Sequence, residues 1–212
     1  MSIKKIKLEV VVFFCGAIVM AYEIIGSRIL GPYVGTSMVV WSSIIGIILF
    51  SLSAGYYYGG RVADNHPEHR RLALIIGTAG SFILLSLLFK SGLMNLLTGT
   101  FQSIYLISVV SSLLLFAIPA FLLGMVSPFA ARLKIRNTET AGATVGYLYA
   151  LSTVGSITGT FLAGFYLIPG YRLTTILMIL GLLLIVLAVF LYSENRDPET
   201  LSINENITHE KN

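Results

Sequence analysis

The sequence predicts an all-α integral membrane protein with six transmembrane helices, and three observations lead to this fold class. Hydrophobic residues make up 56% of the 212 residues and charged residues only 11%, whereas soluble domains carry about 25% charged residues. The apolar residues gather into six runs, each near the roughly 20 residues that span a bilayer. Most Lys and Arg residues stand between those runs, so the +4 net charge forms no basic patch for nucleic acid.

The first three spans are expected at residues 8–30, 37–59 and 72–89. The first is too long for a signal peptide and has no small-residue cleavage site at its end, so we expect it to be retained. The second has Trp41 near one end and a run of tyrosines near the other, as expected for aromatic side chains at the two membrane interfaces. The third begins after Arg70 and Arg71 and ends before Lys90.

The last three spans are expected at residues 101–131, 141–168 and 173–192. The fourth contains Pro119 and Pro128, each of which removes a backbone hydrogen bond and favours a kink. The fifth carries Gly155 and Gly159 at the spacing that lets two helix backbones approach closely. We therefore expect one transmembrane domain, residues 1–192, followed by a polar and disordered cytoplasmic tail, residues 193–212.

The placement of Lys and Arg predicts the orientation in the bilayer. Eleven of these residues fall at the N-terminus, in the second and fourth connections and in the tail, whereas Arg28, Lys90 and Arg172 fall on the other side. Both termini are therefore expected in the cytoplasm, and the lipid bilayer is expected to be the cytoplasmic membrane of a prokaryote. The eleven are Lys4, Lys5, Lys7, Arg61, Arg70, Arg71, Arg132, Lys134, Arg136, Arg196 and Lys211.

A weak internal repeat relates the two halves of the chain at an offset of 104 residues. Arg28 then corresponds to Arg132, and the remaining matches are glycines or other small residues. Three helices per repeat would place the second copy upside down relative to the first. This arrangement is the 3+3 inverted repeat found in many transporter folds. The glycine matches are Gly55 with Gly159, Gly60 with Gly164 and Gly77 with Gly181.

Glu23 is the only acidic residue deep within a predicted span. A charge in the hydrocarbon costs about 2.5–3.5 kcal/mol on insertion scales, so Glu23 must face protein, face water or be protonated. It shares one helical face with Gly16, Met20 and Ser27, which predicts a small and polar seam toward the bundle. Two interpretations stay open: a hydrogen bond or ion pair between helices, or a site for a cation or proton.

Several motifs together resemble the membrane half of the fused major-facilitator and spermidine-synthase-like family, over roughly residues 10–190. One is the stretch from Tyr22 to Ser37, with Trp41 after it, in which Glu23, Ser27, Arg28, Pro32 and Gly35 match the family pattern. The others are Gly55 to Asp64, including Gly60 and Arg61, then Gly124 to Pro128 with Arg132, Gly146 to Gly155, and finally Gly159, Gly164 and Pro169.

The resemblance implies a six-helix module equivalent to half of a major facilitator. In the fused family a soluble aminopropyltransferase-like domain with an S-adenosylmethionine-type fold follows the helices, whereas here a short polar tail follows. The chemistry of that domain therefore does not carry over, and we expect no cofactor, metal or catalytic residue. The link to polyamines rests on the resemblance alone.

Two hypotheses of function follow. In the first, a transporter-like module handles a polyamine or another small cation, which Glu23 would meet with Tyr22 and Trp41 as cation–π partners. A homodimer could enclose the path, with Gly155 and Gly159 as a candidate interface. In the second, the chain is a non-catalytic membrane anchor for a separately encoded transferase. A third, an intramembrane enzyme, is the weakest because no nucleophile–base pair is evident.

Overall fold

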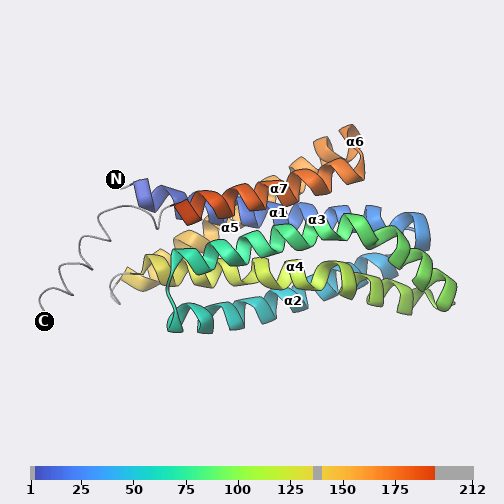
Figure 1. Cartoon of the computed structure of the whole chain (residues 1–212), viewed down its shortest axis with the longest axis horizontal. Helices are drawn as coiled ribbons and strands as arrows, with labels where there is room; N and C mark the ends of the chain where they lie inside the picture. The colour runs from blue at the N-terminus through green and yellow to red at the C-terminus, as the bar shows by residue number, and fades with distance from the viewer. Residues whose placement is uncertain (1–2, 136–139, 194–212) are drawn as a thin grey trace, which may run out of the picture.

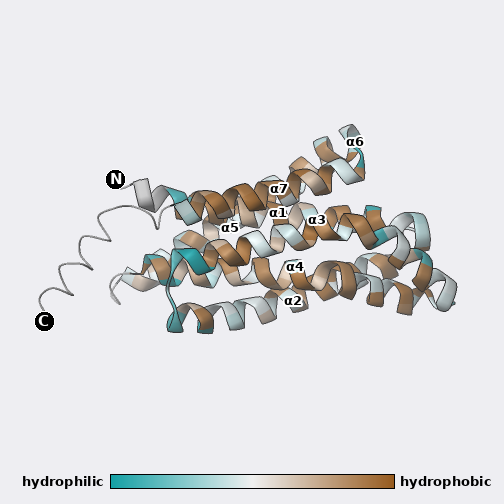
Figure 2. Cartoon of the chain, in the orientation of Figure 1, coloured by the Kyte–Doolittle hydropathy of each residue, from teal (hydrophilic) through white to brown (hydrophobic). Residues whose placement is uncertain are grey.

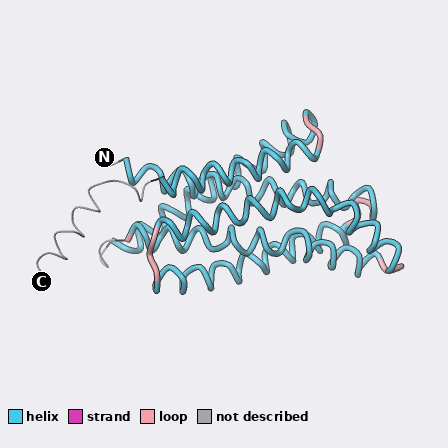
Figure 3. The backbone as a smooth tube through the Cα atoms, in the orientation of Figure 1, coloured by secondary structure: helices cyan, strands magenta, loops and turns pink. Residues whose placement is uncertain are grey.

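The computed structural model describes residues 3–135 and 140–193, with the side chains of residues 3–6 left aside. All regular structure in these ranges is helical, without a strand, and the connections are short (Figure 3). The helices are α1 Ile3–Val34, α2 Met38–Asn65, α3 His69–Thr100, α4 Ile104–Lys134, α5 Ala141–Leu162, a π-helical turn Ala163–Leu167, α6 Ile168–Gly170 and α7 Leu173–Tyr192.

Six helical segments in the described residues are long and apolar enough to cross a membrane, with the residues from Ala141 to Gly170 forming one of them. This confirms the six predicted spans and the compatibility with an integral membrane protein. The segments run side by side in one elongated bundle (Figure 1). Brown apolar residues line most of their length, and teal polar residues are concentrated where α2 ends and α3 begins (Figure 2).

Several helices extend beyond the apolar runs that predicted them. The helix α3 continues to Thr100, although its apolar run ends before Lys90. Hydropathy reports the part of a helix that suits hydrocarbon, whereas the backbone hydrogen bonds continue into the polar interface. The predicted fifth span contains a π-helical turn that the apolar pattern did not indicate. The predicted tail lies outside the described residues, apart from Ser193.

Three pairs of helices make the most extensive contacts: α2 with α4, α3 with α7, and α1 with α5. Small residues allow the close approach. A side chain at Gly55 would meet the carbonyl oxygen of Phe121 in α4, and one at Gly159 would meet that of Ala17 in α1. The face with Gly155 and Gly159 is therefore covered by α1 of the same chain, and the expected homodimer stays a prediction.

Candidate functional site

Glu23 lies in the middle of α1, and its side chain is only 9% exposed. Its seam neighbour Ser27 is also buried and donates its hydroxyl to the carbonyl of Ile24 at 2.9 Å. Within the described residues, no group donates a hydrogen bond to the Glu23 carboxylate, and no cation pairs with it. Arg28, by contrast, is exposed. The predicted seam therefore does face the bundle, and its carboxylate is unpartnered there.

A polar cavity of about 40 Å³ lies one helical turn from Glu23. Such a volume exceeds the roughly 10–15 Å³ that a water molecule needs. Four helices surround it, and most of the polar atoms come from serine hydroxyls. Ser127 lines the cavity with 9% exposure, and Ser156 donates to the carbonyl of Gly16 at 3.2 Å. The lining residues are Cys15, Gly16, Val19, Leu52, Tyr56, Leu123, Ser127, Ser152 and Ser156.

The two aromatic residues expected beside Glu23 have different surroundings. Tyr22 is buried, donates its hydroxyl to the carbonyl of Leu115 at 2.9 Å, and packs its ring 5.0 Å from that of Phe116. It therefore fastens α1 to α4. Trp41 is half-buried in the first turn of α2, where its backbone N–H donates to Ser37. Within the described part of the chain, the structure records no cation–π contact for either residue.

The last turn of α1 and the connection to α2 together contain three of the motif residues, Pro32, Gly35 and Ser37. Pro32 lies in the last turn of α1, and Gly35 has a φ of 80°, a left-handed conformation that glycine adopts without steric cost. Ser37 is the N-cap of α2, and its carbonyl accepts from the backbone N–H groups of Val40 and Trp41. The motif therefore shapes a tight connection at one end of the bundle.

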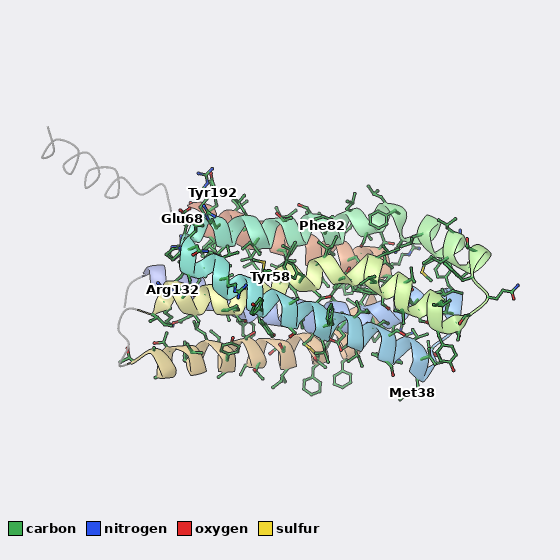
Figure 4. The ribbon with its side chains drawn as sticks, turned by 90° about the horizontal axis from the view of Figure 1, so that it is seen from below. Met38, Tyr58, Glu68, Phe82, Arg132 and Tyr192 are labelled. Carbon is green, nitrogen blue, oxygen red and sulfur yellow. The ribbon has the colours of Figure 1, made fainter. Side chains whose placement is uncertain are left out.

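The other end of the bundle is held by two ion pairs between helices. Arg132 in α4 donates to Asp64 in α2 at 2.8 Å, so two motif residues far apart in sequence are joined. Arg132 is labelled in Figure 4. Lys134 pairs with Glu9 of α1 at 2.5 Å. The sequence pattern did not indicate the pair of Lys134 with Glu9. Arg61 is placed elsewhere, with its guanidinium 4.2 Å from the ring centroid of Tyr57.

The remaining motif residues lie within the helices. Pro128 lies inside α4, which continues as a helix from Ile104 to Lys134. Gly155 and Gly159 provide the close contact with α1, whereas Gly60 faces open space. Within the described residues, no three His, Cys, Asp or Glu side chains gather as they would around a metal ion.

Comparison of this chain with family models, curated proteins and solved structures finds no match in any of the three. The resemblance of the motifs to a known family is therefore a basis for a proposal only.

Proposed function

We propose that this chain is a transporter-like membrane module for a small cation, with Glu23 as the residue that meets the positive charge. The observation that carries the proposal is Glu23, a residue only 9% exposed whose carboxylate has no partner in the described residues, whereas Glu9, Asp64 and Glu68 are each paired with a cation. An isolated charge inside a membrane is costly and marks a functional position by default.

The cavity lined by Val19, one helical turn before Glu23 in α1, supports this function. Hydroxyl groups such as those of Ser127 and Ser156 can accept from an ammonium group or from water. At about 40 Å³, the cavity is too small for an organic cation, so passage requires the helices around it to move. A polyamine is the first substrate to test, because the motifs resemble those of spermidine-synthase-like proteins.

An inverted 3+3 repeat, giving half of a major-facilitator-like fold, is also part of this proposal. The contact of Gly55 with Phe121 and that of Gly159 with Ala17 are related by the 104-residue offset. The same offset relates Glu23 to Ser127, so two buried polar residues flank the boundary between the halves. Transporters with inverted repeats bind their substrates at such a boundary near the middle of the bilayer. A homodimer would complete a full-size unit.

The test is cation binding and flux in liposomes that contain wild-type protein or Glu23→Gln. Spermidine is the probe. The glutamine keeps the shape of the side chain and removes its charge, so we expect binding to weaken at least about tenfold. The matched control is Glu68→Gln, which removes an exposed acid at the N-cap of α3 and should keep flux. Unchanged flux in Glu23→Gln would refute the assignment of this residue.

The second candidate function is a membrane anchor for a soluble transferase. It is favoured by the exposed side chains that α2 presents near the Asp64–Arg132 end, namely Tyr57, Tyr58 and Arg61. Purification from the native host in mild detergent would separate the two functions. A stoichiometric soluble transferase that is lost on Arg61→Glu supports the anchor, whereas a protein purified alone that binds spermidine supports the transporter.

A further inference from the structure

Three cationic residues from three different helices lie at the end of the bundle opposite the Asp64–Arg132 pair. Arg28 is near the end of α1, Lys90 is in the last third of α3, and Arg172 is the N-cap of α7. These helices meet because α7 packs along α3 and also contacts α1 (Figure 1). They are the three Lys and Arg residues that fall on the opposite predicted side from the other eleven.

A cavity of about 160 Å³ lies between these three helices. Arg28 and Lys90 both line it, together with Tyr33 and Ser91, which bring two hydroxyl groups. Leu173 completes the lining at the first turn of α7, immediately after Arg172. Since a water molecule needs roughly 10–15 Å³ of such space, the cavity has room for a group the size of a tetrahedral oxyanion together with water.

No acidic side chain in the described part of the chain neutralises these cations. Glu9, Asp64 and Glu68 are paired with other cations. Glu23 precedes Arg28 by five residues, which places it about 140° around α1 and on another face. Neighbouring cations repel each other unless an anion lies between them. The first turn of α7 contains no acidic residue either, and its free N–H groups favour an anion.

We propose that this cavity binds a phosphate group, carried by a phospholipid of the adjoining leaflet or by a soluble phosphate compound. The guanidinium of Arg28 provides planar paired donors, and the ammonium of Lys90 provides a compact charge, both of which suit phosphate oxygens. Tyr33 and Ser91 supply further hydroxyl donors. The site lies on a different face of α1 from Glu23, so it does not depend on the proposed transport function.

The experiment measures phosphate recognition by the full chain purified in detergent. Native mass spectrometry would compare phosphatidylglycerol with diacylglycerol, which lacks the phosphate group, and thermal unfolding would compare inorganic phosphate with chloride at equal ionic strength. We expect one retained phosphatidylglycerol if the source is lipid, or a higher Tm in phosphate if the source is soluble. Arg28→Gln and Lys90→Gln should each weaken the effect about tenfold, the weight of one charge-assisted hydrogen bond.

Two further variants keep the test decisive. Lys90→Arg retains the charge and should retain binding, whereas Arg70→Gln removes an exposed cation from the opposite end and should leave binding unchanged. If Lys90→Gln does not fold, Ser91→Ala replaces it, because Ser91 lines the cavity and is exposed. The proposal is overturned if the wild type prefers neither phosphate ligand, or if the neutral variants bind as tightly as the wild type.

Discussion

The pairing of acidic side chains separates one residue from the others in the described ranges. Glu9, Asp64 and Glu68 each have a cationic partner within 4 Å, and all three lie close to helix ends. Glu23 lies mid-helix without one. Side chains at helix ends can reach water, whereas Glu23 is only 9% exposed within the bundle. The functional interpretation of Glu23 therefore depends on its position more than on its residue type.

At this scale we predict that the two inter-helix ion pairs differ in strength. The side chains of Glu9 and Lys134 are 17% and 18% exposed, whereas those of Asp64 and Arg132 are 69% and 45% exposed. Water screens the exposed pair, so Asp64→Asn should lower the free energy of unfolding by less than about 1 kcal/mol. Glu9→Gln leaves the shielded ammonium group of Lys134 with a neutral and weaker partner. It should therefore lower the free energy of unfolding by about 2 kcal/mol.

Denaturant unfolding in detergent at low and high salt would check this difference. Salt should reduce the contribution of the exposed pair and affect the shielded pair less. Equal losses in Asp64→Asn and Glu9→Gln would contradict the ranking.

The helix pairs depend on glycines where backbones touch, and not on every glycine. A side chain at Gly159 would meet the backbone of Ala17, whereas one at Gly146 in the same helix would meet open space. Alanine is a better helix former than glycine by about 1 kcal/mol, which applies where space allows it. The same substitution is therefore expected to act in opposite directions at two positions of α5.

We predict that Gly159→Ala destabilises the protein by about 1–3 kcal/mol, because the new methyl group forces α5 away from α1. Gly146→Ala should be neutral or stabilising. Gly55→Ala should match Gly159→Ala, since Gly55 makes the corresponding contact with α4. Thermal unfolding of the three variants gives the comparison. A stable Gly159→Ala protein would mean that α1 and α5 are not in backbone contact.

At the scale of the whole molecule, the sequence predicts the number of helices better than their packing. Continuous apolar runs are a sufficient signal for six spans, because a bilayer requires a minimum apolar length. The rotation of each helix about its axis is a different matter. These helices are apolar on most sides, so no polar stripe tells which face turns inward.

The candidate site also depends on the rotation of each helix about its axis, so only part of it could be predicted. Glu23 is identified from sequence because a lone acid in an apolar span is conspicuous. The cavity with Ser127, Ser152 and Ser156 is not, because its lining comes from four helices and depends on how each is rotated. The pair of Glu9 with Lys134 is missed for a similar reason, since the two residues are 125 positions apart. Predicting this pair would require knowing which charged side chains lie at the same end of the bundle.

The orientation of the whole molecule gives a last prediction. The six long helical segments run back and forth, so the start of α1 and the end of α7 lie at the same end of the bundle, with Glu68 and Tyr192 near that end and Met38 near the other (Figure 4). The excess of Lys and Arg at the first end predicts that it faces the cytoplasm. Part of this excess comes from residues whose side chains lie outside the described part of the chain, namely Lys4, Lys5, Arg136, Arg196 and Lys211.

Cysteine labelling of intact cells can decide the orientation. In a Cys15→Ala background, which removes the native and buried thiol, a cysteine would be introduced at Thr36 or at Asn65. These positions lie in or beside connections at opposite ends of the bundle. A membrane-impermeant maleimide should label Thr36→Cys in intact cells, and Asn65→Cys only after lysis. The reverse pattern would invert the molecule and place the 160 Å³ cavity, lined by Arg28 and Lys90, against the inner leaflet. The phosphate site would then recognise lipids or solutes of the cytoplasmic side, so labelling also decides which leaflet supplies its ligand.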